Sequence, residues 1–166
     1  MSDQPHANNL RTGRRSEEFG TYFITKCTFD RAPFLAAPDA AEEIIKALAF
    51  QRAAGHIRLL AFVIMPDHYH SIFCLMPNEN LSDVMRRIHS FTSNRLRATL
   101  KLQSPVWQPD GFYDRRCRDA EEVNNLIEYT HHNPVRKGFV QKAEEWQYSS
   151  AHPTRRDYVD WDCWSG

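Results

Sequence analysis

The chain has 166 residues, about the size of one domain, and its 42% hydrophobic and 25% charged residues are ordinary for a globular protein. No apolar run is long enough for a membrane span or a secretory leader, which predicts a cytoplasmic protein with no membrane partner. The 4 cysteines lie far apart without a CxxC pair, which argues against a disulfide framework and a thiolate zinc site. Lys+Arg and Asp+Glu both number 21, so the net charge is zero and no strongly basic signature for nucleic acid is present.

Charge is nevertheless unevenly distributed along the sequence. Arginines concentrate between residues 83 and 101 and again between 115 and 118, whereas glutamates gather elsewhere in pairs. Because a phosphate backbone is met by a local basic patch, the distribution matters more than the net charge. We therefore expect two DNA-contacting clusters, made of Arg86, Arg87 and Arg95 and of Arg115, Arg116 and Arg118.

The first half of the chain predicts an arm, a strand, a helix and a hairpin. Residues 1–18 are polar and aperiodic, which is typical of a flexible arm. Residues 20–29 are rich in β-branched and aromatic side chains and predict a strand, and a helix follows from Asp39 until Gly55 ends it. Two apolar runs, 57–65 and 68–76, are separated only by a Pro-Asp turn, so they predict paired strands.

The second half predicts a helix, a short strand and a last helix. Helical apolar spacing follows a Ser82 cap as far as Lys101, and the aromatic stretch 106–117 predicts a fourth strand. Asp119 predicts the start of the last helix, which we expect to be interrupted at Pro134 and ended by Gly138. The order predicts an α+β fold in residues 19–150: a ferredoxin-like βαββαβ antiparallel sheet with helices on one face and an added C-terminal helix. Residues 151–166 form an aromatic-rich tail that we expect to pack on this domain.

Two histidines in the second strand of the hairpin are candidates for a metal site. His68 and His70 are two residues apart, so in a strand their side chains project from the same face. Imidazole is a common ligand of divalent metals, and the pair would supply half or two thirds of a coordination shell. An HxH pattern also arises often by chance, and two hydrogen-bonded or solvent-facing histidines explain it at least as well.

The last helix carries a candidate nucleophile, and helical spacing predicts an amide side chain beside it. Tyr129 and Asn133 are four residues apart, so their side chains lie roughly 40° apart on the flank of the apolar stripe. A tyrosine hydroxyl there can act as a nucleophile next to an amide oxygen that completes a metal site. Considered alone, a packing tyrosine with a hydrated hydroxyl is the simpler explanation.

Taken together with their flanking residues, the two motifs resemble one family. The segments 65–70, MPDHYH, and 129–140, YTHHNPVRKGFV, are similar to REP-associated tyrosine transposases of the HUH single-tyrosine superfamily. The likeness extends to WQ at 107–108, GFYDRRCRD at 111–119 and WQYSS at 146–150, and so covers nearly all of residues 19–150. It implies a ferredoxin-like fold and a transposase that cleaves and rejoins single-stranded DNA at palindromic REP-type hairpins through a 5′-phosphotyrosine.

The resemblance also implies roles for individual residues. His68 and His70 would be ligands of Mg²⁺ or Mn²⁺, Tyr129 the nucleophile and Asn133 the third ligand. If the backbone turns before Pro134, then His131 or His132 competes with Asn133 as the ligand. Arg136 and Lys137, inside the second motif, join the expected DNA-binding residues, and the protein would act as a monomer or a homodimer.

Three other functions fit parts of this pattern. A non-catalytic nucleic-acid module is one, because four-stranded sheets of this topology also serve RNA recognition. A domesticated relative that binds hairpin DNA without cutting it is another. The third is a metal hydrolase that uses His68, His70 and a water, although the sequence has neither HExxH nor the zinc-deaminase signatures. A covalent protein–DNA adduct would distinguish the transposase from all three.

Overall fold

The computed structural model describes residues 19–160. Within this range four strands form one antiparallel sheet in the order β2-β3-β1-β4, the ferredoxin-like arrangement predicted from the sequence. The elements are β1 (Thr21–Cys27), α1 (Pro38–Ala53), β2 (Ile57–Met65), β3 (His68–Leu75), α2 (Leu81–Leu100), β4 (Tyr113–Arg116) and α3 (Ala120–Arg136). The expected arm, 1–18, and the end of the expected tail, 161–166, lie outside the described residues.

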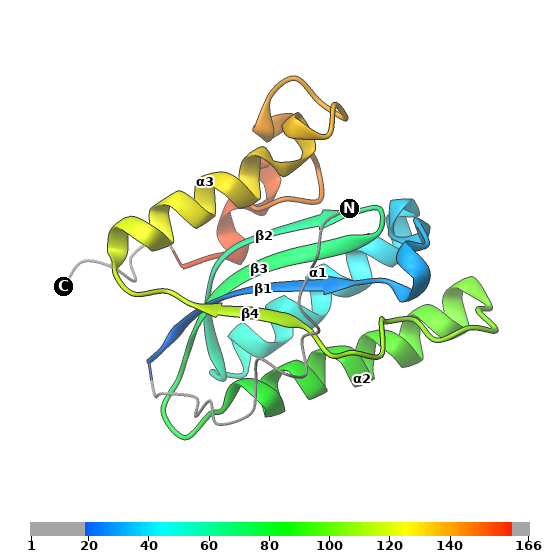
Figure 1. Ribbon diagram of the computed structural model, residues 1–166, viewed down its shortest axis with the longest axis horizontal. Coiled ribbons are helices and arrows are strands. Elements are labelled where there is room, and N and C mark those ends of the chain that lie inside the picture. The colour runs from blue at the N-terminus through cyan, green and yellow to red at the C-terminus, as the bar shows by residue number, and fades with distance from the viewer. Residues whose placement is uncertain (1–18, 161–166) are drawn as a thin grey trace.

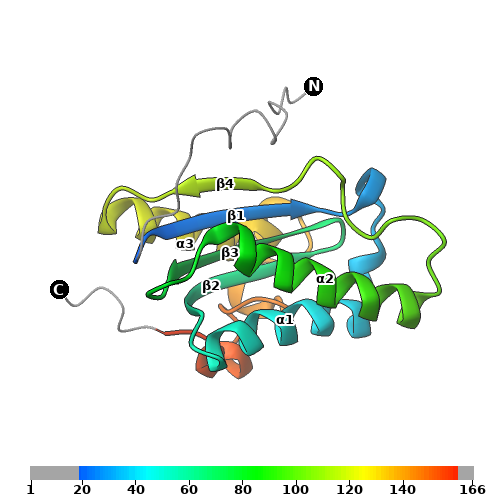
Figure 2. The same ribbon diagram turned by 90° about the horizontal axis from the view of Figure 1, so that it is seen from below.

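The sheet separates two layers of helix. Helices α1 and α2 run along one face, whereas α3 lies on the opposite face (Figures 1 and 2). A large apolar core, which includes Phe62, Tyr69 and Phe73, fills the layer between the sheet and α1 and α2. A smaller core, which includes Phe23 and Val123, joins α3 to the other face. The helix that bears Tyr129 is therefore kept apart from the other two helices by the sheet.

Local capping explains where the helices begin. Helix α2 starts after Asn80, whose side-chain oxygen accepts from the main-chain N–H of Asp83 at 2.9 Å, so the predicted Ser82 cap is wrong by two residues. Helix α3 starts after Asp119, as predicted, with the Asp119 carboxylate accepting from the N–H of Glu122 at 2.8 Å. Each cap satisfies an N–H group that has no partner within its helix.

Helix α3 runs through Pro134 to Arg136, so the predicted interruption is wrong. A proline in the last turn removes only a main-chain bond near the end of the helix. The helix then closes at Gly138, with a φ of 76°, where the N–H groups of Gly138 and Phe139 bond to the carbonyls of Val135 and Pro134 at 3.0 and 2.9 Å. Tyr129 and Asn133 consequently keep their helical spacing.

The fourth strand is shorter than predicted. It spans only Tyr113–Arg116, because the first half of the aromatic stretch, which contains Pro109 and Gly111, forms a loop. Trp107 in this loop makes an isolated bridge with Thr28. The loop thereby closes over the end of β1 instead of extending the sheet.

The free edge of β2 is covered by the segment 146–150, one of the motifs singled out in the sequence. The N–H of Ile64 donates to the Tyr148 carbonyl at 2.8 Å, and the N–H of Ser150 donates to the Phe62 carbonyl at 3.0 Å. The Trp146 indole adds a bond to the Ile64 carbonyl at 2.9 Å. Pairing of this kind protects a sheet edge that would otherwise template association.

None of the described helices has the length and apolar character that crossing a bilayer requires.

Candidate active site

Two buried histidines mark the face of the sheet that α3 covers. His68 and His70 are 6% and 5% exposed, and their ring centroids are 4.8 Å apart with the planes inclined by 73°. Both belong to β3, where Tyr69 between them points into the large core on the opposite face. Strand alternation therefore brings the two imidazoles together on one side.

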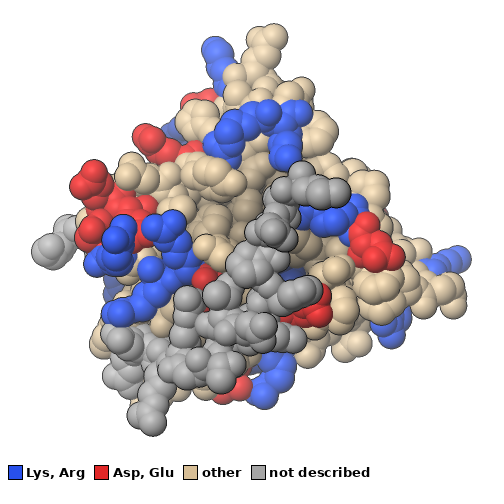
Figure 3. Space-filling view, in the orientation of Figure 1, with Lys and Arg blue, Asp and Glu red and all other residues tan. Residues whose placement is uncertain are grey.

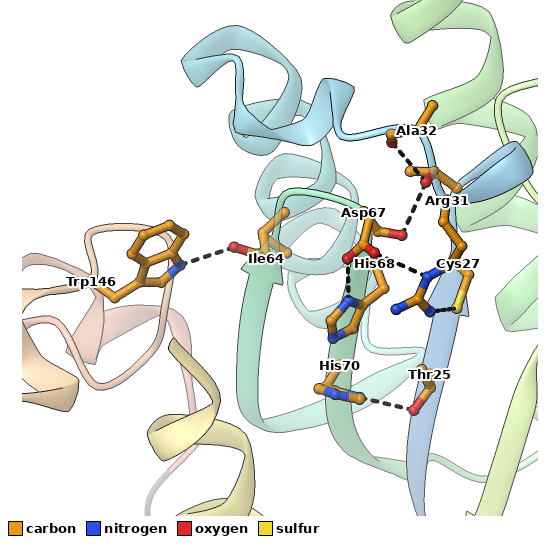
Figure 4. A network of polar contacts seen from close by, with 10 residues as sticks. Thr25, Cys27, Arg31, Ala32, Ile64, Asp67, His68, His70 and Trp146 are labelled. Carbon is orange, nitrogen blue, oxygen red and sulfur yellow. Dashed lines mark hydrogen bonds and ion pairs between the residues drawn. The ribbon is translucent and has the colours of Figure 1, made fainter. Parts of the chain in front are cut away.

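Both rings are held through Nδ1. His68 Nδ1 is 2.7 Å from the Asp67 carboxylate, and His70 Nδ1 is 2.8 Å from the hydroxyl of Thr25 on the neighbouring strand (Figure 4). A carboxylate only accepts, so Nδ1 of His68 carries the proton and donates it to Asp67. Bonds of this kind orient an imidazole and leave Nε2 as the nitrogen that ligates a metal.

The environment keeps both imidazoles neutral. Burial lowers the pKa of His70 to about 3; the proximity of His68, because two protonated imidazoles would repel each other, and the charge of Arg136 act in the same direction, against a weaker opposing contribution from the Ile24 main chain. Burial also lowers the pKa of His68, although the neighbouring Asp67 acts in the opposite direction. Neutral imidazole is the form that binds a metal ion.

Tyr129 on α3 lies against this pair. Its ring makes edge contacts with His70, at 5.8 Å between centroids, and with Phe23, at 6.0 Å. The Arg136 guanidinium carbon is 4.1 Å from the Tyr129 centroid, and Arg136 Nη2 donates to the Tyr129 carbonyl at 2.7 Å. The ring is thus held by three neighbours, while 46% of the residue remains exposed and accessible to a large substrate.

The residues expected to compete for the third ligand position lie differently. Asn133, one turn after Tyr129, is only 4% exposed. His131 Nε2 is bonded to Ser150 Oγ at 2.8 Å, and His132 Nδ1 to the Glu128 carbonyl at 3.0 Å. Both histidines line a surface pocket of about 770 Å³ to which His68, His70 and Tyr129 do not contribute. The structure thus engages His131 and His132 elsewhere.

The donor set at this site suits a divalent cation with open coordination positions. Two neutral imidazoles are available, and Asn133, buried on α3, carries an amide oxygen of the kind that Mg²⁺ accepts as a ligand. Within residues 19–160 no third His, Cys, Asp or Glu side chain lies close enough to His68 and His70 to form a cluster of three. A site with few protein ligands leaves positions for phosphate oxygens, as Mg²⁺ and Mn²⁺ sites that bind phosphates do.

The basic residues predicted to bind DNA divide into two groups. Arg136 and Lys137 lie at the end of α3, close enough for their charges to lower the pKa of His70 and His68 respectively. In the view of this face, Lys and Arg side chains stand in groups around a central hollow (Figure 3). Arg86, Arg87 and Arg95 belong to α2, on the other side of the sheet, and are not brought to the histidines.

Several of the predicted arginines are paired with carboxylates. Arg95 Nε is 3.1 Å from Glu43 on α1, and Glu122 on α3 contacts both Arg115 and Arg118. Acidic and basic residues that are separate along the sequence are therefore adjacent in the structure at these positions. Strand alternation places Arg116, the register partner of Tyr22, on the face opposite to Arg115.

Sequence reasoning missed three residues that hold the histidines or lie beside them. Asp67 was taken only as a turn former, yet its carboxylate contacts both His68 and Arg31. Thr25 is the register partner of His70, which only the strand pairing reveals. Arg31 lies in a turn without any sequence signature, and nothing in the pattern could have singled it out.

Comparison with known proteins shows the family to which the chain belongs. The family model described as "Transposase IS200 like" matches residues 20–133, a range that includes the histidine pair, Tyr129 and Asn133. The chain therefore belongs to the IS200-like transposase family, which consists of DNA-processing enzymes.

Within that family the chain is similar to REP-associated tyrosine transposases. One such protein of Haemophilus influenzae is 25% identical over 162 residues, which cover 89% of this chain and 88% of the relative. Another, of Escherichia coli K12, is 27% identical over 93 residues, 55% of this chain and 53% of the relative. A solved REP-associated tyrosine transposase bound to a REP hairpin has a TM-score of 0.68 and 25% identity, over 92% of this chain and 89% of that one. The resemblance and the fold predicted from the motifs are confirmed.

Proposed function

We propose that the chain cleaves and rejoins single-stranded DNA at palindromic, REP-type hairpins, with Tyr129 as the nucleophile. The observation that carries this proposal is the contact of Tyr129 with His70: a half-exposed tyrosine of α3 packs against a buried imidazole of β3, 5.8 Å between centroids. The similar transposase solved with a REP hairpin supports the choice of substrate.

The reaction that suits this arrangement is a phosphoryl transfer to the phenol. Tyr129 Oη attacks the phosphorus, the Oη–P bond forms and the P–O3′ bond breaks. The phenol loses its proton to solvent and the departing 3′-oxygen takes one up, so the tyrosine holds the 5′-phosphate. The phosphotyrosine ester preserves the reactivity of the broken bond, and the 3′-hydroxyl of another strand can reverse the step to rejoin DNA. Arg136 and Lys137 add positive charge near the phosphate oxygens.

A divalent cation, Mg²⁺ or Mn²⁺, would be held by Nε2 of His68 and of His70 and by the Asn133 amide oxygen. When bound, it supplies Lewis-acid polarisation of the phosphate. The protein prepares for it by keeping both imidazoles neutral and by engaging Nδ1 of each ring, with Asp67 and with Thr25. Burial of the histidines also limits competing water.

The decisive experiment seeks the covalent intermediate. A hairpin oligonucleotide labelled on the 3′ side of the cut is incubated with the protein and Mg²⁺, and we expect a denaturation-resistant adduct whose peptide contains Tyr129. Tyr129→Phe should bind the hairpin but form no adduct, because it keeps the ring and loses only the hydroxyl. Tyr113→Phe is the matched control, since Tyr113 is a similarly exposed tyrosine on β4. An adduct elsewhere, or cleavage by Tyr129→Phe, contradicts the proposal, and hairpin binding without any adduct identifies a non-catalytic binding protein.

A further inference from the structure

The turn that follows β1 has an unusual backbone. Asp30 and Arg31 have φ values of 51° and 56°, in the left-handed region that non-glycine residues seldom occupy. Thr28 fixes one side of the turn, because its N–H donates to the Asp67 carbonyl at 3.0 Å, and its hydroxyl lies 2.8 Å from the Ala32 carbonyl and 3.0 Å from that of Asp67. The other side is fixed by Gln108, whose side chain accepts from the N–H of Asp30 at 3.1 Å. Two successive strained residues held from both sides point to a local function.

This turn positions the side chain of Arg31. Arg31 Nε is 2.9 Å from Asp67 Oδ2, and Arg31 Nη1 donates to Cys27 Sγ at 2.8 Å. The other oxygen of the same carboxylate, Oδ1, is 2.7 Å from His68 Nδ1. Figure 4 shows the guanidinium, the carboxylate and the imidazole in contact one after another. Asp67 therefore bridges Arg31 and His68, using one oxygen for each.

Stability alone does not account for this pair. The side chains of Arg31 and Asp67 are 51% and 28% exposed, and ion pairs in such positions contribute little to folding. Orientation is a better explanation, because the terminal torsion of an aspartate is broad and a carboxylate with one partner can rotate. A guanidinium bound to Oδ2 fixes the plane of the carboxylate, so that Oδ1 stays directed at the imidazole.

We propose that Arg31 is a positioning residue that acts through Asp67 to hold His68 in its Nδ1-protonated tautomer, with Nε2 directed at the metal site. This inference rests on the proposed cation site at His68 and His70. Arg31 should therefore affect the His68 imidazole even before DNA or metal is bound.

The first test uses nitrogen NMR of the metal-free protein labelled at histidine. The parent should show His68 with the proton on Nδ1, and Arg31→Ala should raise the population protonated on Nε2. The same variant should bind Mn²⁺ about 10-fold more weakly, the lower end of what outer partners of metal ligands contribute. Arg31→Lys should recover much of both, since it restores a cation beside Asp67. Lys46→Ala is the matched control: it removes an exposed cation, paired with Glu43 at 3.4 Å on α1, and should change neither measurement.

A double-mutant cycle tests whether Arg31 acts through Asp67. In an Asp67→Asn background, Arg31→Ala should weaken Mn²⁺ binding less than about twofold further, because the link is already broken. Independent effects of the two substitutions, or an unchanged tautomer and Mn²⁺ affinity in Arg31→Ala, would overturn the inference. Arg31→Gln, which keeps most of the side chain without its charge, is measured in the same way and should change both readouts in the same direction. His68→Ala separates the two proposals, because unchanged Mn²⁺ binding there refutes the cation site itself.

Discussion

The two faces of the sheet differ in what the same strands present. Toward α1 and α2 the strands contribute large apolar side chains, such as Phe62 and Tyr69, to the larger core. Toward α3 the residues next to Tyr69 are His68 and His70, and β1 adds Thr25. Since side chains alternate along a strand, one short segment can anchor the fold on one face and supply chemical groups on the other.

Helix α3 buries fewer apolar residues than α1 or α2. Its apolar contacts form the smaller core around Phe23 and Val123, and polar links supplement them, such as the bond between His131 and Ser150. The site thus lies between the sheet and a helix that buries fewer apolar side chains than α1 or α2. If one face of the sheet mainly provides stability and the other mainly provides the chemical groups, then a substitution on one face should leave the property that the other face provides intact.

The largest expected effect comes from removing either imidazole. His68→Ala or His70→Ala should lower hairpin cleavage by more than about 100-fold, beyond the usual range for outer partners of a metal ligand, because one remaining imidazole holds a hard cation poorly. Chelation should do the same to the parent. Gel assays of cleavage, with circular dichroism as a control for folding, measure both properties. Parental cleavage in either variant or in the chelated sample contradicts the metal-site assignment.

The opposite face should give the converse result. Phe62→Ala, at a position with 0% exposure in the larger core, should lower the free energy of unfolding by about 3–5 kcal/mol, since it leaves a cavity. Leu126→Ala, in the partly buried margin of the smaller core, should cost less than the roughly 2–5 kcal/mol typical of buried leucines. Denaturant titrations give both values. A larger loss in Leu126→Ala than in Phe62→Ala would mean that the α3 face also anchors the fold.

The sequence predicted the features that depend on interactions between residues close together in the chain, and it missed features that depend on contacts between distant residues. The strands, the helices and the position of Tyr129 on a helix depend on local periodicity, which the sequence displays. The Asn80 cap and the continuation of α3 through Pro134 were missed, because competing caps and the tolerance of a proline in a last turn depend on surrounding structure. Boundaries were therefore predicted less well than elements.

The site residues that belong to a sequence motif were predicted. Those that join the site only through contacts with residues distant in the chain were missed. The motifs singled out His68, His70 and Tyr129, and the structure brings these three together. Arg31 lies 36 positions before Asp67 along the chain, and no periodicity connects them. The pairing of Arg95 with Glu43 likewise depends on how α1 packs against α2, so the sequence showed separated charges where the fold joins them.

A smaller effect is expected at the third ligand position. Asn133→Ala should weaken Mn²⁺ binding and cleavage by about 10–100-fold, less than the loss of an imidazole, because water can replace an amide oxygen. His132→Ala is the matched comparison, since its ring is bonded to the Glu128 carbonyl and should leave both properties unchanged. Calorimetry with Mn²⁺ and cleavage assays decide between them. If His132→Ala has the greater effect, the backbone at Asn133 adopts a different arrangement when the metal binds.

The smallest expected effect concerns the salt dependence of DNA binding, and it asks whether DNA also reaches the face of α2. Each phosphate contact to a single strand contributes about 0.7 to the slope of log K against log salt. Replacing both Arg136 and Lys137 by Gln should therefore flatten the slope by up to about 1.4, since both lie by the histidines. The double variant Arg86→Gln and Arg87→Gln should flatten it by at most about 0.7, because both arginines are paired, Arg86 with Asp83 and Arg87 with Glu79, and only Arg86 is largely exposed, at 71%. Fluorescence titrations of a labelled hairpin over a range of salt concentrations give these slopes. An unchanged slope in the α2 variant would confine DNA to the face of the histidines, and a larger change there than in the α3 variant would place its main electrostatic contact on α2.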